Sequence, residues 1–519
     1  MRRSLLLITL TVAACGPTVT LTPSGTTAPR AVAAAPDVGV HSITAADVSR
    51  RIHLIADDSM MGRGTPSRGL EMMANYAASE FRRLGLRPAG DNGGFLQRYP
   101  LYISRFDPAK SWIRTTGRAT AAWTLGPDVP LFTGEPSGGV TGAGVVFVVG
   151  DSVEGVTIPE GAVTGKIVVV VMGPQVDGIA GQLIQQKPAG VFLVTDLPDQ
   201  QWALAPGKVP STRVVNPSEN EQSIPPVFAF RRPAFEAWLA QAGAPAGVLA
   251  TKGAVRAIPL AGTTVSFHVD QQRVGEASAP NVIGVLEGSD PALKSEYVIY
   301  SGHMDHIGTP GDGEGCSARG ADSICNGADD DGSGSVAVLE LAEAWAMSPV
   351  RPKRSMAFIL VSGEERGLWG SAYWTSHPTL PVANVVADLN IDMVGRNAPD
   401  TVAVIGREHS DLSATLDRVV LTHPEHGLKA VGDLWPSEGL YFRSDHFNFA
   451  RKGIPVLFFT SGLHEDYHAV TDTPDRLDAD KDARIARLLY HLGETIANTP
   501  TRPQWDPASR AKIVEGATP

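Results

Sequence analysis

Two regular spacings of apolar residues predict most of the helices and strands. Between Leu70 and Leu84 apolar residues recur every three or four positions, which is typical of one buried helix face, and Gly85 ends the pattern. After Asn281, short apolar runs alternate with helical stretches, which predicts an α/β fold with a mostly parallel sheet flanked by helices. The predicted strands lie at 297–300, 356–361, 389–393 and 455–460, and the predicted helices at 335–347 and 481–497.

The middle of the chain has a different pattern of apolar residues and turns. Short β-branched runs such as 145–149 and 167–171 are separated by turns rich in glycine and proline. We predict an inserted β-rich domain at 122–270, between a first part of the α/β domain at 41–121 and its main part at 271–499. Residues 500–519 are predicted to form a C-terminal tail.

The N-terminus has the pattern of an export signal. Two arginines precede an apolar run that ends at Ala14, directly before Cys15, and the run is too short to span a bilayer. The segment resembles a bacterial lipoprotein signal at 1–14, which implies a lipid on Cys15 and a flexible tether at 15–40; an ordinary cleaved signal is the alternative. The expected location is therefore the cell envelope, and Gly16, where an Asp would suggest inner-membrane retention, favours the outer membrane.

Composition narrows the classes of function. The 519 residues include 44 Lys and Arg against 55 Asp and Glu, a formal net charge of −11. An acidic chain without long basic clusters argues against nucleic acid as a partner. Of the three cysteines, Cys316 and Cys325 remain once Cys15 is assigned to the lipid, and they could form an intrachain disulfide or stay as free thiols.

Residues that bind metals or move protons cluster after the predicted strands, where parallel sheets usually bind ligands. His303 and Asp305 follow the first strand and share a face, so Asp305 could orient His303 as a metal ligand. Three carboxylates, Asp329 to Asp331, precede a helix, and Glu364 and Glu365 could divide metal binding and proton transfer. Asp392 lies in a buried run, and His468 follows the last strand.

Residues 464–468 match the HExxH motif of single-zinc proteases. That motif requires a helix, whereas this segment lies between a strand and a turn-rich stretch, so we do not expect a zincin site. The chain contains no G-x-S-x-G elbow that would indicate a serine hydrolase. The remaining set suits two divalent ions that share a carboxylate: His303, Asp330, Glu365, Asp392 and His468.

The order of these motifs resembles the di-zinc M28 peptidase family, which includes aminopeptidases and glutamate carboxypeptidase relatives. The motifs are His-x-Asp, Gly-Ala-Asp-Asp-Asp-Gly-Ser-Gly, Gly-Glu-Glu-x-Gly, Ile-Asp-Met and a late His before Thr-Asp-Thr-Pro, all within 281–497. The stretch 122–267 resembles the protease-associated domain often inserted in such enzymes, through 165–168 and 189–191.

The resemblance implies a role for each matching position. Two zinc ions per chain would be bound by His303 with Asp392 and by Glu365 with His468, with Asp330 as the bridge. Glu364 would be the general base that activates a metal-bridging water, and Asp305 would orient His303. Tyr441, three residues before 444–446, would donate a hydrogen bond to the substrate carbonyl.

The implied function is removal of N-terminal residues from peptide substrates. A carboxypeptidase or dipeptidase of the same family is an alternative and would need a basic group for the terminal carboxylate, for which Arg396, Arg407 and Arg443 are candidates. A third alternative is a receptor or binding module on the same fold, although the intact ligand set argues against a loss of metals.

Overall fold

The computed structural model describes residues 38–517 except 127, 134–137, 153–156, 204–210, 219–224, 251 and 313–314. The predicted signal at 1–14, Cys15 with its predicted lipid and nearly all of the predicted tether therefore lie outside the described residues. None of the helices in the described part combines the length and apolar character needed to cross a bilayer.

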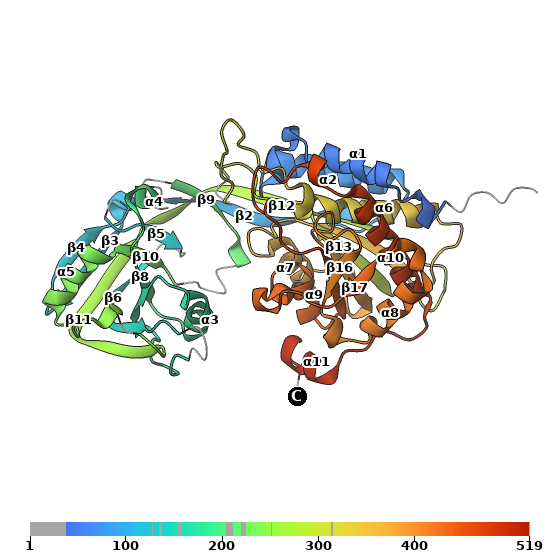
Figure 1. Ribbon diagram of the computed structural model, residues 1–519. Helices are drawn as coiled ribbons and strands as arrows, with labels where there is room; N and C mark the ends of the chain where they lie inside the picture. The colour runs from blue at the N-terminus through green and yellow to red at the C-terminus, as the bar shows by residue number, and fades with distance from the viewer. Residues whose placement is uncertain are drawn as a thin grey trace, which may run out of the picture. The chain divides into compact units, whose positions relative to one another are not determined.

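The larger of two sheets has parallel strands at its centre (Figure 1). The central strands β18, β15, β13 and β14 run parallel, as predicted, and antiparallel strands follow on both sides of them. The sheet order is β17 (Lys429–Val431), β16 (Thr401–Ile405), β18 (Val456–Thr460), β15 (Val385–Ile391), β13 (Tyr297–His303), β14 (Ser355–Val361), β12 (Gln271–Leu286), β2 (Leu96–Phe106) and β9 (Ser211–Val215), with β1 (Arg87–Pro88) beside β12.

Alternate residues of the central strands fill two separate cores. In β14, Phe358 and Leu360 pack on one face, while Ile359 and Val361 pack on the other, as expected where both faces of a sheet are covered. One face is covered by α1 (Ala45–Ile55), α2 (Arg68–Arg83), α6 (Gly334–Met347), α8 (Leu412–Thr422) and α10 (Ala479–Asn498). The other is covered by α7 (Trp369–Ser376), α9 (His446–Arg451) and α11 (Pro507–Ile513).

The helix boundaries follow from local capping. The side chain of Ser67 accepts a hydrogen bond from the N–H of Leu70 at the start of α2, and Asp478 does the same for Lys481 at the start of α10. The apolar spacing at 70–84 thus lies in α2, and the helices predicted at 335–347 and 481–497 are α6 and α10.

The middle segment forms a second sheet. Its order is β4 (Ala121–Thr124), β3 (Trp112–Gly117), β11 (Arg256–Val269), β6 (Gly138–Val149), β7 (Ile167–Val171), β8 (Gly190–Thr195), β10 (Val227–Arg231) and β5 (Leu131–Thr133). Its helices are α3 (Val176–Gln186), α4 (Asp199–Ala203) and α5 (Arg232–Ala242). Because β3 belongs to this sheet, the β-rich segment begins earlier than the predicted residue 122. Its likeness to a protease-associated domain stays a prediction.

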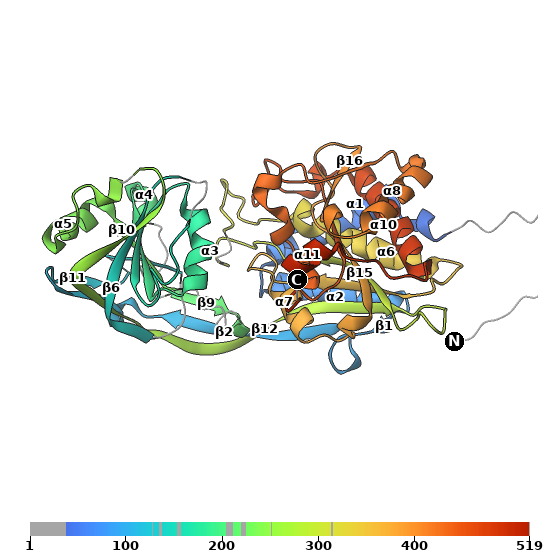
Figure 2. The ribbon, with the colours of Figure 1, turned by 90° about the horizontal axis from the view of Figure 1, so that it is seen from below.

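Two long strands begin and end the middle segment. Figure 2 shows β2 and β12 side by side, and they pair antiparallel from Leu96 with Val282 to Phe106 with Gln271. Strand β11 ends at Val269, and β12 starts at Gln271, so a single residue separates strands of the two sheets. Strand β9, which comes from within the middle segment, pairs with β2 of the larger sheet.

Cys316 and Cys325 form the intrachain disulfide, with their Cα atoms 5.9 Å apart. They pack with Ile307 and Val470 in a small apolar cluster. The N–H of Cys325 also donates to the carbonyl of Gly308, so the loop between β13 and α6 is closed at its base by both a covalent bond and a hydrogen bond.

Phe81 provides a test of how strongly the N-terminal helices depend on the larger sheet. Its ring is fully buried in α2 against Phe95 and Phe358 of β14. We expect Phe81→Ala to lower the free energy of unfolding by about 3 to 5 kcal/mol, because it leaves a cavity between helix and sheet. Leu54→Ala, at a 43% exposed position in α1, is the control. It should change the free energy of unfolding, measured in urea, by about 0.5 kcal/mol or less. Equal effects would contradict this packing.

Candidate metal centre

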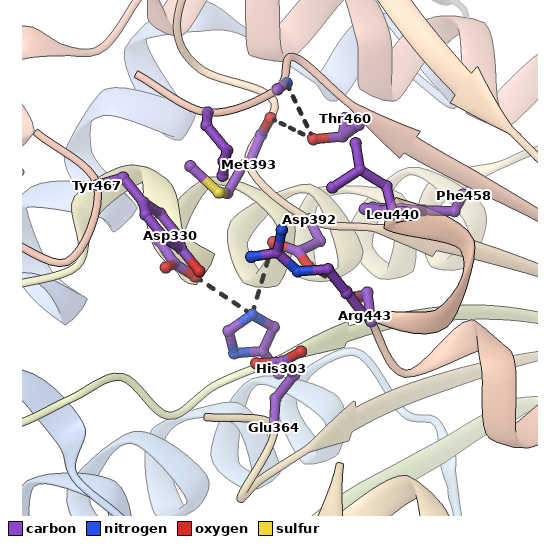
Figure 3. Close-up of a pocket in the computed structure, with 13 residues that line it drawn as sticks. His303, Asp330, Glu364, Asp392, Met393, Leu440, Arg443, Phe458, Thr460 and Tyr467 are labelled. Atoms are coloured by element: carbon purple, nitrogen blue, oxygen red, sulfur yellow. Dashed lines mark hydrogen bonds and ion pairs between the residues drawn. The ribbon is translucent and has the colours of Figure 1, made fainter. Parts of the chain in front are cut away.

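The predicted ligands meet at the carboxyl ends of the parallel strands. Figure 3 shows His303, Asp330 and Asp392 from this set. His303 is the last residue of β13, Glu365 follows β14, and Asp392 directly follows β15. His468 lies in the loop after β18, and Asp330 lies in the turn before α6. Parallel strands bring their carboxyl ends to one edge, so residues far apart in sequence come together there.

Asp330 lies between two groups of side chains. On one side, Nε2 of His303 is 3.4 Å from Oδ1 of Asp330 and 3.5 Å from Oδ1 of Asp392. On the other side, Nε2 of His468 is 3.2 Å from Oδ2 of Asp330 and 2.9 Å from Oε2 of Glu365. The two oxygens of Asp330 thus face different imidazoles, which is the arrangement a bridging carboxylate needs.

The electrostatics of this cluster favour positive charge. Burial lowers the pKa of His303, but Asp392 and Glu364 outweigh burial and raise it well above its ordinary value. Burial also lowers the pKa of His468, yet Asp330 and Glu365 raise it to about 10. Imidazole nitrogens and carboxylate oxygens are the donors that zinc prefers, so the residues present fit bound divalent ions.

The three consecutive aspartates have different roles. Asp331 accepts hydrogen bonds from the backbone N–H groups of His303, Gly334 and Met393. Asp331 is also within reach of His303 and Asp392 as a possible ligand, but both of its oxygens accept these N–H groups, so Asp330 fits the ligand role better.

Asp329 and Asp472 complete this backbone network. Asp329 accepts from the N–H of Gly395 and lies 3.1 Å from Nε2 of His464. Asp472 accepts from the N–H groups of Asp329 and Asp330. These contacts could not be predicted from the sequence, where the run of adjacent carboxylates indicates only that their negative charge must be balanced.

Asp305 contacts both a ligand and the predicted base. Its Oδ1 is 3.6 Å from Nδ1 of His303 and accepts a hydrogen bond of 3.3 Å from the N–H of Glu364. Its Oδ2 accepts from the hydroxyl of Thr65. Removal from water raises the pKa of Glu364 well above its ordinary value, and the nearby carboxylates of Glu365 and Asp445 add to the rise. A carboxylate with a raised pKa is better suited to accept a proton.

Tyr441 is not among the side chains that line the pocket, so its predicted contact with the substrate carbonyl stays a prediction. Its ring is buried in the apolar core, where it packs against His409 and His446. The spacing from 444–446 could not show on which side of the short turn at Leu440–Phe442 the ring would lie. Tyr467, beside the ligand His468, lines the pocket instead (Figure 3).

The HExxH match is not a zincin site. Residues 464–468 form turns after β18 rather than a helix, as expected from the sequence. His464 faces Asp329, whereas His468 faces Asp330 and Glu365, so the two imidazoles do not converge.

His306 lies at the site, although no role could be assigned to it from the sequence. Its Nδ1 is 2.8 Å from Oε1 of Glu365 and 3.7 Å from Oδ2 of Asp330. It is fully buried and, with Asp330 and Glu365, makes a possible ligand group. Its position three residues after His303 was the available signal.

The pocket over the metal centre combines carboxylates with apolar side chains. Among the three candidate arginines, Arg443 lines this pocket, whereas Arg396 is paired with Asp466 and Arg407 with Asp417. The remaining lining includes these residues: Met393, Leu440, Phe458, Leu463 and Tyr467.

Arg63 links the backbone segments that carry the site. Its guanidinium is fully buried and donates to four backbone carbonyls, those of Ile55, Met304, Asn326 and Gly327. It therefore joins the end of α1, the segment after β13 and the residues just before the turn that carries Asp330. No periodic pattern marks this arginine in the sequence.

Comparisons with known proteins agree with this arrangement. Residues 281–493 match the model of peptidase family M28. Leupeptin-inactivating enzyme 1 of Streptomyces exfoliatus is 30% identical over 253 residues, which cover 44% of this chain and 51% of that protein. A probable leucine aminopeptidase of Arthroderma otae is 28% identical over 227 residues, covering 42% of this chain and 58% of that protein. The chain thus spans about half the length of these curated relatives.

A solved structure shares the fold. An aminopeptidase from Aneurinibacillus sp. strain AM-1 aligns with 89% of this chain and 96% of its own, with a TM-score of 0.53 and 18% identity. The cluster of imidazoles and carboxylates lies within residues 281–493, the part of the chain that matches peptidase family M28. In this part the chain is similar to that family.

Arg63→Met tests the support beneath the centre. The change leaves buried carbonyls without donors, so we expect the free energy of unfolding to fall by about 3 kcal/mol or more in urea titrations. Arg50→Met, at an exposed position in α1, should change it by about 0.5 kcal/mol or less. If Arg63→Met lowers the free energy of unfolding no more than the control does, these hydrogen bonds add little to stability.

Proposed function

We propose that this chain is a zinc-dependent aminopeptidase that removes N-terminal residues from peptides. The observation that carries the proposal is the position of Asp330, with one oxygen facing His303 and the other facing His468. Two ions would be held by His303 with Asp392 and by Glu365 with His468, bridged by Asp330. Such ions polarise a peptide carbonyl and lower the pKa of a water molecule.

The chain's own residues then handle the proton. Glu364 lines the same pocket as His303, Asp330 and Asp392. Its carboxylate would accept the proton of the attacking water and deliver it to the nitrogen of the leaving amine. The contact between Asp305 and the N–H of Glu364 would hold the backbone of the base in place.

The lining of the pocket supports the aminopeptidase choice. The carboxylates of Glu364 and Asp392 suit the positive charge of a free N-terminus. Leu440, Phe458 and Leu463 offer an apolar wall for the first side chain. One relative bears the name probable leucine aminopeptidase, in keeping with an apolar preference.

A carboxypeptidase or dipeptidase is the second candidate because of Arg443. This arginine lines the pocket, and its partner Glu438 is 3.3 Å away in a partly exposed pair. A guanidinium there could bind the terminal carboxylate of a short peptide through two hydrogen bonds.

Product mapping separates these functions. The zinc-loaded protein is incubated with peptides that differ in a free or acetylated N-terminus and a free or amidated C-terminus, and the products are identified by mass spectrometry. We expect stepwise loss of N-terminal residues from every peptide with a free amine, because the carboxylates need that charge. Cleavage that requires a free C-terminus would favour the Arg443 alternative, and no cleavage would favour a binding protein.

Glu364→Gln tests the base. The amide keeps the size of the side chain but cannot accept the proton, so turnover should fall by about 100-fold or more. Zinc content, measured by elemental mass spectrometry, should stay at the level of the unchanged protein. Glu365→Gln is the matched control, because it alters the ligand next in sequence and should lower zinc content as well. The assignment is wrong if Glu364→Gln keeps most of its activity.

A further inference from the structure

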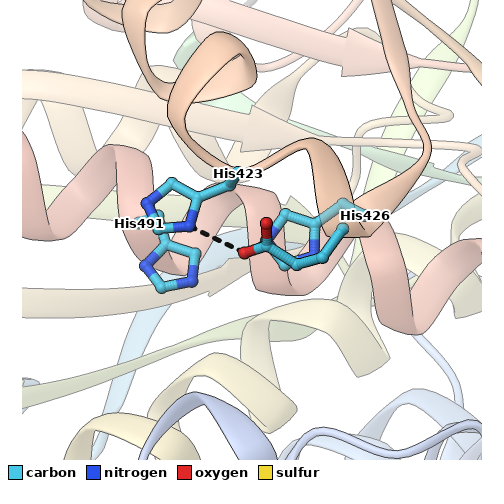
Figure 4. Close-up of side chains that lie close together, drawn as sticks. His423, His426 and His491 are labelled. Atoms are coloured by element: carbon cyan, nitrogen blue, oxygen red, sulfur yellow. Dashed lines mark hydrogen bonds and ion pairs between the residues drawn. The ribbon is translucent and has the colours of Figure 1, made fainter.

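A second group of metal-binding side chains lies outside the metal centre (Figure 4). His423 caps the end of α8, Glu425 and His426 lie in the turn that follows, and His491 lies on α10. One ligand atom of each residue lies within 4.8 Å of those of the other three. None of the four lines the pocket over Asp330.

The side chains face one another at short range. The rings of His423 and His491 stack with centroids 3.7 Å apart, and the ring of His426 is 5.4 Å from that of His491. Oε1 of Glu425 is 2.9 Å from Nδ1 of His423 and 4.0 Å from Nε2 of His426. Four donors from two elements thus surround one point.

His426 is the unusual member of this group. Its side chain is 7% exposed, and its buried Nε2 has no hydrogen-bond partner. A buried ring nitrogen without a partner is costly, so it calls for a ligand.

Binding requires modest side-chain rotation. Donors around a tetrahedral zinc lie about 3.3 Å apart, closer than the present limit of 4.8 Å. The parallel rings of His423 and His491 must also turn so that their nitrogens converge. Both of these side chains are partly exposed, and Glu425 is largely exposed, so they have room to move around the buried His426.

We propose that His423, Glu425, His426 and His491 form a further site for a divalent zinc ion, separate from the metal centre. Three imidazoles and one carboxylate make a donor set typical of zinc. The ion would tie the turn after α8 to α10, a helix whose Leu489 carbonyl accepts a hydrogen bond from Tyr300 of β13. The site would stabilise the helix layer and would not take part in peptide cleavage.

Zinc counting tests this site. The full chain and its variants are dialysed against the same buffered free zinc concentration, and bound zinc per chain is measured by elemental mass spectrometry. We expect His491→Ala and His423→Ala each to bind one zinc fewer than the unchanged chain, with peptide cleavage within about twofold of it. His53→Ala, an exposed histidine on α1, should bind as much as the unchanged chain.

Comparison with the unchanged chain separates this proposal from the function of the centre. The predicted loss of one zinc holds whatever the occupancy around Asp330, because neither substituted histidine belongs to that centre. Added zinc should also raise the thermal unfolding midpoint of the unchanged chain more than that of His491→Ala, with circular dichroism as a check on folding. Equal zinc contents in the unchanged chain and in both cluster variants would overturn the site.

Discussion

The crowding of carboxylates at one buried sheet edge is the constraint on which the rest of this domain depends. Asp329, Asp331 and Asp472 each accept backbone N–H groups, so their charge is used to hold loops together. Asp330 and Glu365 instead face imidazoles. Since buried carboxylates are costly without compensation, the folded chain needs both the N–H donors and a cationic occupant at this edge.

Much of the central architecture could be predicted from the sequence, because its strands are continuous apolar runs and its helices have clear periods. The strands predicted at 297–300 and 356–361 are β13 and β14. Strand direction has no such signal, so the positions of the antiparallel strands outside the centre could not be predicted. The assignment of β3 to the second sheet was missed for the same reason, because pairing partners are distant in sequence.

The candidate site shows a similar division. Residues that directly follow buried strands could be placed because the strand itself fixes their position, as for His303 and Asp392. Tyr441 depends on the path of a short turn, and that path packs its ring into the core. Arg63 and His306 act through contacts with distant segments, which no local pattern reveals.

The division of roles among the three aspartates also restricts how such a chain can change its length. Their neighbours come from two loops, because Gly395 follows β15 whereas Asp472 and His468 both follow β18. If an insertion or deletion directly before Asp329 shifted the run by one residue, a different carboxylate would face each partner. Evolutionary gains and losses of residues are therefore expected in the disulfide-closed loop upstream, where extra length can be accommodated without shifting this register.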